Sequence, residues 1–438
     1  MKSIMYKNGA LKIFLFIFII FSGSCEKNNG APFTPDFSFS IKEGNIVEFK
    51  NLSEGEYHRL TWTFGNGISD SNTDKTKVFE IYYPQAGDYE VTLKLADYEG
   101  NSETVKKTIT ISNTDLQPSF NLTVAPDNAN KYNLVNTTEG TYDSFCWKYR
   151  TKTIENQLQH TAYFPFAGTY TVELQVTKLN NTFSETKTVT IVQDDANYLE
   201  NLTLAWSDEF DNETINLQNW TFETGASGWG NNELQNYTNG ENAQIVDGKL
   251  IITARKVNEN TSVGSYTSSR MVSKEKKEFQ YGKIEISAKL PAGRGIWPAL
   301  WMLGGNIDSA GWPACGEIDI MEYVGFDPNM VHATVHTPVG YGANGNGNGM
   351  LLETCEEEFH IYGLLWTEKK MQFYIDEPQN VIHTYQPATQ TNANYPFHQP
   401  FFFILNVAVG GNWGGAQGID NSIFPQSLEI DYVRVYQE

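Results

Sequence analysis

The chain has 438 residues and a formal net charge of −21, from 31 Lys and Arg against 52 Asp and Glu. This length is typical of about three domains, and the acidic balance argues against nucleic acid or anionic lipid headgroups as the main partner, since both need a basic surface. Aromatic residues make up 13%, which excludes a disordered chain and suits β structure, and four cysteines without C-x-x-C spacing exclude a disulfide-dense scaffold.

The first 24 residues have the pattern of a secretory signal peptide. Three lysines precede an apolar run over residues 13–21, which is far shorter than the roughly 20 residues that span a bilayer. The small residues that lead into Cys25 resemble a bacterial lipobox, so we expect lipidation of Cys25; the alternative is ordinary cleavage near Ser24. Residues 25–35 are polar and predict a flexible tether. We expect the protein to be exported, lipid-anchored to the bacterial outer membrane and displayed at the cell surface, with no other membrane contact.

Two related β modules follow the tether. Residues 87–95 and 168–176 alternate apolar with polar side chains at an offset of 81 residues, as half-buried strands do. Trp62-Thr-Phe-Gly-Asn-Gly67 resembles the signature of PKD domains, which are immunoglobulin-like sandwiches, whereas Phe145-Cys-Trp-Lys-Tyr149 is a degenerate match. We therefore predict PKD-like domains over 36–113 and 116–193. They act either as spacers or in direct glycan binding.

The remaining residues, 200–438, predict a third and larger domain. Residues 193–200 are polar and aperiodic, and beyond them nearly every segment is a short alternating strand bounded by Gly, Asn or Pro. No amphipathic helix of three turns is expected. The pattern predicts an all-β sandwich or jelly roll, so that the whole chain is all-β.

Three carboxylates in six residues, Glu317, Asp319 and Glu322, are the most unusual feature of this domain. On a regular strand Glu317 and Asp319 share a face, and Glu322 points to the other. A β-bulge at Ile320–Met321 would return Glu322 to the same face. Three crowded acids cannot all ionise cheaply, so at least one pKa should rise, and an acid beside a carboxylate is the pair that hydrolyses glycosides. The alternatives are a solvated acidic strand and a cation site.

With these motifs the chain resembles glycoside hydrolase family 16, specifically its bacterial laminarinase-like endo-β-1,3-glucanases. The resemblance implies a concanavalin A-like β-jelly roll of two curved sheets with an open cleft, a Glu317 nucleophile, a Glu322 acid/base and Asp319 as the residue that tunes both. The matching segments are residues 206–210, 228–235, 281–285, 297–304, 316–322, 336–338, 405–413 and 431–436.

The tryptophans and polar residues around these motifs are the expected sugar contacts. Trp297 and Trp301 share a strand face and are interpreted as glucose platforms, with Pro298 indicating an edge or a bend; the alternative is core packing. Arg270 matches a family position that binds sugar hydroxyls, although a surface charge is the alternative. Of two adjacent asparagines, Asn232 is favoured over Asn231 for the same role.

Three further residues complete the expected site. His336 shares a strand face with His332 and is expected to approach Glu322, unless it is a buried structural histidine. Asn406 interrupts an apolar run, which indicates an amide facing the cleft, and Trp413 lies among glycines that could cover the bound chain. Trp312 is not assigned.

The resemblance also implies a structural calcium on the convex side, bound by Glu209, the carbonyl of Gly248 and Asp431. Such oxygen ligands suit a hard cation. Whether Cys315 and Cys355 form a disulfide stays open.

We therefore expect a monomeric retaining endo-β-1,3-glucanase that needs no cofactor for catalysis and whose partner is laminarin-type β-glucan. The alternatives are a non-catalytic surface β-glucan-binding lipoprotein, and a hydrolase of an algal galactan or mixed-linkage glucan.

Overall fold

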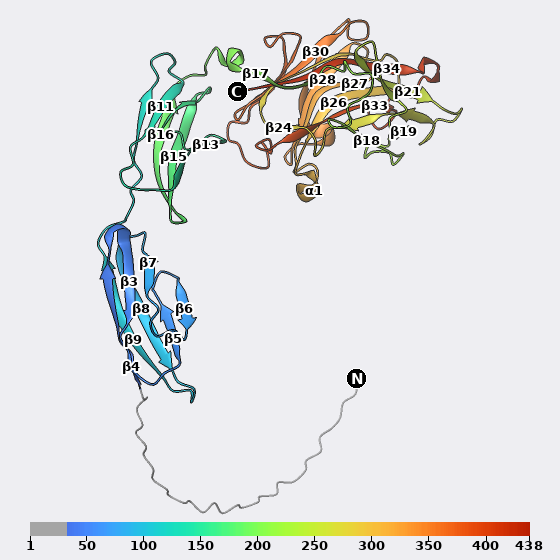
Figure 1. The fold of residues 1–438 in the computed structure, drawn as a ribbon. Helices are drawn as coiled ribbons and strands as arrows, with labels where there is room; N and C mark the ends of the chain where they lie inside the picture. Colours follow the sequence, from blue (N-terminus) through green and yellow to red (C-terminus); the bar gives the residue numbers. More distant parts are fainter. Residues whose placement is uncertain (1–32) are drawn as a thin grey trace, which may run out of the picture. The chain divides into compact units, whose positions relative to one another are not determined.

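A computed structural model describes residues 33–438 (Figure 1), so the predicted signal peptide and Cys25 lie outside the described residues. The chain forms two compact units. The first contains the described residues as far as Phe164 together with Gly168–Ile191, and the second contains Pro165–Ala167 together with Val192–Glu438. Within residues 33–438, no helix has the length and apolar character needed to cross a bilayer.

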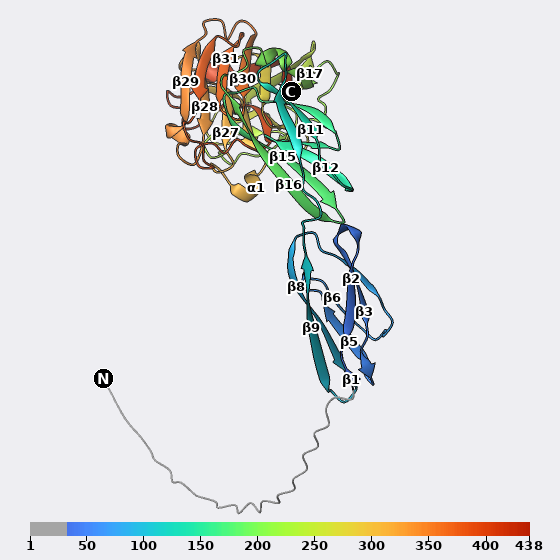
Figure 2. The same ribbon diagram turned by 90° about the vertical axis from the view of Figure 1, so that its left-hand side faces the viewer.

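The first unit contains two β-sandwiches with the same strand order. Each pairs a three-stranded sheet with a four-stranded sheet, and β8 and β9, like β15 and β16, lie side by side (Figures 1 and 2). The first sandwich consists of β2 (Phe37–Ile41), β3 (Ile46–Asn51) and β7 (Phe79–Tyr82), with β6 (Ser69–Asn72), β5 (Arg59–Thr63), β8 (Gly87–Ala96) and β9 (Ser102–Ile111), and a short pair of β1 (Phe33–Thr34) and β4 (Glu54–Gly55). The second consists of β10 (Phe120–Val124), β11 (Lys131–Asn136) and β14 (Gln159–Tyr163), with β13 (Lys152–Glu155), β12 (Ser144–Tyr149), β15 (Gly168–Lys178) and β16 (Asn181–Ile191).

Each sandwich has its own core around one buried tryptophan. Trp62 on β5 and Trp147 on β12 occupy equivalent strands and are almost fully buried. The alternation that predicted the strands is seen as well, because Leu93 on β8 and Leu174 on β15 both point into these cores. The second module therefore keeps the sandwich although its tryptophan motif is degenerate.

The second unit consists of two large sheets. The ten-stranded sheet contains β19 (Gln235–Tyr237), β22 (Tyr266–Ser268), β21 (Lys249–Lys256), β34 (Gln426–Gln437), β25 (Gly282–Lys289), β30 (His360–Trp366), β31 (Met371–Ile375) and β32 (Val381–Tyr385), with β17 (Thr203–Asp208) on β34 and β20 (Ala243–Val246) on β21. The eight-stranded sheet contains β18 (Thr221–Glu223), β23 (Arg270–Val272), β33 (Phe401–Val409), β26 (Ile296–Gly304), β27 (Glu317–Tyr323), β28 (Met330–His336) and β29 (Asn346–Leu351), with β24 (Glu278–Phe279) on β33.

Helix is scarce, as the sequence predicted. Within residues 33–438 the one α-helix is the four-residue α1, and the other turns of helix are short 3-10 segments. The bounds are α1 (Ile307–Ala310), η1 (Glu43–Asn45), η2 (Tyr198–Asn201), η3 (Gly342–Asn344) and η4 (Asn421–Ile423).

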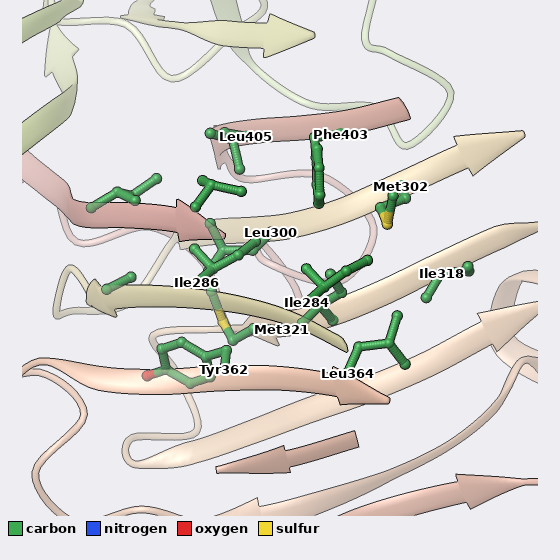
Figure 3. Packing of buried hydrophobic residues seen from close by; sticks show 14 of the residues in the cluster. Ile284, Ile286, Leu300, Met302, Ile318, Met321, Tyr362, Leu364, Phe403 and Leu405 are labelled. Carbon is green, nitrogen blue, oxygen red and sulfur yellow. The ribbon is translucent and has the colours of Figure 1, made fainter. Parts of the chain in front are cut away.

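The core of this unit lies between the two sheets. Leu300 and Phe403 on the eight-stranded sheet lie opposite Ile286 and Leu364 on the ten-stranded sheet, and all four side chains are fully buried (Figure 3). Full burial of such a side chain contributes about 1.5–3 kcal/mol. Because one face of the eight-stranded sheet is committed to this core, its other face is free to form a binding surface.

Strand β26 lies in the middle of the eight-stranded sheet, between β33 and β27. The expectation that Pro298 marks an edge strand is therefore wrong. Pro298 pairs with Val407 on β33, whereas the ladder to β27 begins one residue later, at Ala299. The proline has no N–H to donate, and it is tolerated because it lies beyond the end of the β27 ladder.

Candidate active site

Strand β27 presents all three acids on one face because it contains a bulge. Asp319 pairs with Thr334 on β28 and Glu322 with His332, so two residues of β27 oppose one of β28 and the register shifts between the two acids. The same shift appears against β26. Ile320 and Met321, the two residues of the bulge, both point into the core. The bulge predicted from the odd spacing of the acids is therefore present.

The acids line a cleft of about 1040 Å³ on the outer face of the eight-stranded sheet. Strands β26, β27 and β28 form its floor. Side chains alternate along β28, so that His332, Thr334 and His336 face the cleft while Val331, Ala333 and Val335 face the core. Alternation along β28 thus separates the binding surface from the interior.

Each of the two glutamates accepts a hydrogen bond from an indole. Nε1 of Trp312 donates to Oε2 of Glu317 at 2.7 Å, and Nε1 of Trp297 donates to Oε1 of Glu322 at 3.1 Å. Hydrogen bonds to a carboxylate favour its charged form. Sequence reasoning did not assign Trp312, because it lies in a loop that only the fold brings over Glu317.

His336 contacts the other end of the acidic row from the one predicted. Its Nε2 lies 3.1 Å from Oδ2 of Asp319 and 3.6 Å from Oε1 of Glu317. The strand register sets His336 opposite Glu317, and the bulge sets His332 opposite Glu322. The expected approach of His336 to Glu322 is present only as an electrostatic interaction, which lowers the pKa of Glu322.

Burial raises the pKa of all three carboxyl groups. The pKa of Glu317 lies well above its ordinary value because of burial and the nearby charge of Asp319, and His336 opposes this shift. Burial raises the pKa of Asp319 to about 8. Burial, with a contribution from the charge of Asp319, raises the pKa of Glu322 to about 8. The three carboxyl groups are therefore not all ionised near neutral pH. A protonated carboxyl group can then act as an acid beside an ionised carboxylate.

An arginine clamped by aromatic rings forms one end of the cleft. The guanidinium of Arg270 lies 5.1 Å from the ring centroid of Trp229 and 4.7 Å from that of Trp301. Its Nε donates to Oε2 of Glu223 at 2.5 Å. Arg270 is thus held in place and is not a free surface charge. Trp301, one of these two rings, is itself fixed, because its indole N–H donates to Oδ1 of Asn406 at 2.7 Å.

The structure supports both roles considered for Trp301, as a glucose platform and as a core side chain. Its ring lines the cleft, and it also packs against a small apolar cluster that includes Phe402 and Ile404. Trp297 lines the cleft as well and meets Trp413 edge to face at a centroid distance of 5.6 Å.

A buried polar network behind Asn406 was not anticipated from the sequence. The amide of Asn406 donates to the hydroxyl of Tyr237 at 3.0 Å, and that hydroxyl donates to Glu233 at 3.4 Å. Glu233 also accepts from Gln235 at 2.6 Å and from Asn231 at 3.1 Å. Burial raises the pKa of Glu233. The network fixes the orientation of the cleft-facing amide of Asn406.

Of the two adjacent asparagines, Asn231 lines the cleft and Asn232 does not. Asn232 adopts a left-handed conformation with φ 57° and is exposed, and its amide donates to the side chain of Asn412 at 2.8 Å. The preference for Asn232 is therefore corrected to Asn231, and Asn232 is linked to the cleft only through Asn412, which lines it. The other predicted sugar contacts that line the cleft are Arg270, Trp297, Trp301, His336, Asn406 and Trp413.

The expected calcium ligands do not form an evident site. Both carboxylate oxygens of Glu209 accept hydrogen bonds from Arg434, at 2.9 and 2.7 Å. A Cβ on Gly248 would lie 3.7 Å from Oδ1 of Asp211, so a carboxylate other than that of Asp431 lies beside this glycine. Within the described part of the chain, the one cluster of three acidic, histidine or cysteine side chains close enough for a metal is Glu317, Asp319 and His336. Calcium binding by Glu209, Gly248 and Asp431 stays a prediction.

Cys315 and Cys355 are both buried and both free, so the structure contains no disulfide between them. Burial raises the pKa of the Cys315 thiol to about 11 and that of Cys355 to about 12. Both thiols therefore behave as core side chains.

Comparison with known proteins matches both parts of the chain. The family model described as glycosyl hydrolases family 16 matches residues 230–434, and the PKD domain model matches residues 30–110. A β-glucanase of Rhodothermus marinus is 44% identical over 244 residues, which cover 53% of this chain and 85% of that protein. A glucan endo-1,3-β-glucosidase A1 of Niallia circulans is 37% identical over 261 residues, covering 54% of this chain and 38% of that protein. The crystal structure of a laminarinase from Flavobacterium sp. UMI-01 is similar at 48% identity with a TM-score of 0.50, covering 54% of this chain and all of that one.

Proposed function

Because the chain belongs to glycosyl hydrolases family 16, we propose that its second unit hydrolyses internal β-1,3-glucosidic bonds of laminarin-type β-glucan. The observation that carries this proposal is the bulge in β27, which brings three carboxyl groups with raised pKa values onto the floor of one cleft. Burying three carboxyl groups that repel one another is unfavourable, and glucan binding alone does not require them.

The two glutamates take different roles in a double displacement. Oε of Glu317 attacks the anomeric carbon while Glu322 donates its proton to the departing glycosidic oxygen, so that one C–O bond forms as the other breaks. Glu322 then removes a proton from water, and this water releases the sugar from Glu317. The raised pKa of Glu322, to about 8, supports its role as the acid near neutral pH.

Asp319 tunes this pair. It interacts directly with Glu317 through a hydrogen bond that favours the charged form of Asp319, and the charge of Asp319 in turn raises the pKa of Glu317. Transfer of the shared proton from Glu317 to Asp319 leaves Glu317 as the ionised nucleophile. Since the two glutamates carry both the attack and the proton transfers, the reaction takes no cofactor.

The aromatic and amide groups beside the acids suit a neutral sugar chain. Indole faces such as that of Trp413 stack on the apolar faces of sugar rings, and Asn231, Arg270 and Asn406 offer hydrogen bonds to hydroxyl groups. The cleft contains no cluster of cations that would select a sulfated chain, since Arg270 is already paired with Glu223. This argues against sulfated galactans, and the similarity to a glucan endo-1,3-β-glucosidase supports β-1,3-glucan over neutral galactans. Mixed-linkage glucan is proposed as a secondary substrate.

Release of reducing ends from laminarin, curdlan, lichenan and agarose, measured in parallel, tests the function. We expect the fastest release from laminarin, slower release from lichenan and none from agarose. Binding of laminarin without release would favour the non-catalytic alternative, and faster release from agarose would favour a galactan hydrolase.

We further propose that the chain is exported, anchored at the outer membrane through Cys25 and monomeric, with residues 36–113 and 116–193 as spacer domains. The lipobox-like sequence before Cys25 supports the anchor, and the separate cores of the two sandwiches support their independence. Glu209, Gly248 and Asp431 remain the proposed ligands of a structural calcium, which would have to compete with Arg434 for Glu209.

A further inference from the structure

One side of the cleft is bounded by an unusual run of glycines. The sequence Gly-Asn-Gly-Asn-Gly from residue 345 to residue 349 leads into and along β29, the edge strand that pairs with β28. Gly345, Gly347 and Gly349 all line the cleft, and we refer to them as the glycine ladder. Figure 2 shows β27, β28 and β29 next to one another at this side of the sheet.

Backbone conformation does not explain these glycines. Gly345 has φ −54° and ψ 152°, which any residue adopts, and neither Gly347 nor Gly349 has a positive φ. Glycine in a strand is also unfavourable, by about 0.5–1 kcal/mol relative to alanine. The reason for three glycines at alternate positions must therefore be the space that a side chain would occupy.

Atoms of the neighbouring strand β28 already fill that space. A Cβ at residue 345 would lie 2.5 Å from Cε1 of His336, and a Cβ at residue 347 would lie 2.5 Å from the carbonyl oxygen of Ala333 and 2.6 Å from Oγ1 of Thr334. A Cβ at residue 349 would lie 3.1 Å from the ring of His332. The two imidazoles thus lie over bare backbone, and each rests on one glycine.

Both of these imidazoles face the acidic row. His336 contacts Asp319 and Glu317, whereas His332 lies opposite Glu322 and meets Trp413 edge to face at 5.1 Å. Nε2 of His332 is buried and, among the described residues, has no hydrogen-bond partner. His332 as a whole is half-buried and lines the cleft.

We propose that the glycine ladder is a positioning device in which Gly345 seats His336 against the nucleophile and its partner Asp319, and Gly349 seats His332 beside the acid/base. This inference rests on the proposed function. Gly345 acts on catalysis only through His336, so its loss should appear in kcat. Gly349 acts through a histidine that faces the sugar, so its loss should appear mainly in KM.

A double-mutant cycle on the full chain tests the proposal. Displacing a catalytic contact by about 1 Å costs on the order of a hundredfold in rate, so we expect Gly345→Ala to lower kcat on laminarin at least tenfold with KM within twofold. When His336→Ala has removed the ring, adding Gly345→Ala should cost less than twofold, because only Cγ2 of Thr334, at 2.8 Å from the added Cβ, is left to move. Asn346→Ala, an exposed position on the same strand outside the cleft lining, is the matched control and should leave kcat and KM unchanged.

Two results would overturn the proposal: wild-type kcat in Gly345→Ala, or the same fractional loss in both backgrounds. If circular dichroism shows that Gly345→Ala does not fold, the milder cycle of Gly349→Ala with His332→Ala decides by the same comparison, read in KM. The kcat and KM ratios of the cycle are measured on whichever of the four polysaccharides the wild type cuts. If the wild type cuts none of the four, the proposed function is refuted and not this inference.

Discussion

The indole hydrogen bonds offer a direct way to separate the roles of the two glutamates. Trp312→Phe keeps an aromatic ring over the cleft and removes the N–H that donates to Glu317 at 2.7 Å. This hydrogen bond lowers the pKa of Glu317, so its loss raises that pKa. Because the nucleophile must be ionised, the acid limb of the kcat/KM profile should move to higher pH.

The size of the shift follows from the strength of the bond. A hydrogen bond to a charged group contributes about 1.5–3 kcal/mol, and Trp312 is 46% exposed, so solvent reduces this to about 1 kcal/mol. One pKa unit corresponds to about 1.4 kcal/mol. The acid limb should therefore move up by about 0.7 pH unit, while the alkaline limb stays in place.

Trp297→Phe is the matched variant. Its indole lowers the pKa of Glu322, and this group must be protonated in the first step. Loss of the N–H should therefore move the alkaline limb, and not the acid limb, to higher pH. The assay is reducing-end release from laminarin at limiting substrate over a range of pH. If the two variants exchanged limbs, the roles of Glu317 and Glu322 would be reversed, and unmoved limbs would refute the electrostatic reasoning.

Three further predictions concern the acids, the core and the anchor. Glu317→Gln should abolish turnover while laminarin still binds in affinity electrophoresis. Glu322→Gln should keep measurable activity on aryl glucosides whose leaving groups need no proton. Near-wild-type hydrolysis of laminarin by either variant would contradict the assignment of the two glutamates. Met321→Ala removes a fully buried bulge side chain and should lower the free energy of unfolding in urea by about 2–5 kcal/mol; a loss below 0.5 kcal/mol would show that this side of the bulge is not packed. Cys25→Ala should move the protein from the membrane fraction to the soluble exported fraction with activity intact, and an unchanged distribution would remove the lipid anchor.

The sequence was most informative where periodicity and spacing constrain one another. The odd spacing of Glu317 and Glu322 allowed only two outcomes on a strand, and the bulge that joins them on one face is present. Alternation predicted the sandwich strands and the faces of β28 equally well, because the period of two is a property of every strand.

Loops and cross-strand partners were less predictable, because they depend on geometry that spacing does not carry. Asn231 and Asn232 differ only in which one occupies a left-handed turn. His336 faces Glu317 because of the register between β27 and β28. Trp312 reaches Glu317 from a loop, and Glu233 is linked to Asn406 through Tyr237, which is 169 residues away from Asn406 along the chain.

The glycine ladder illustrates a signal that was visible but not interpretable. Alternating glycine and asparagine is plain in the sequence, yet it reads as a flexible turn until the neighbouring strand is known. Only the position of β28 shows that side chains of His336 and His332 occupy the missing volume.

The stereochemistry of the first product tests the central claim most directly. If the bulge holds Glu317 and Glu322 as an attacking pair, their carboxyl groups stand about 5 Å apart and leave no room for water, so the reaction retains configuration. Proton NMR during the first turnovers of laminarin should then show a β-anomeric reducing end that mutarotates later. An initial α-anomer would mean carboxyl groups roughly 6.5–9.5 Å apart with water between them, and the nucleophile role of Glu317 would be contradicted.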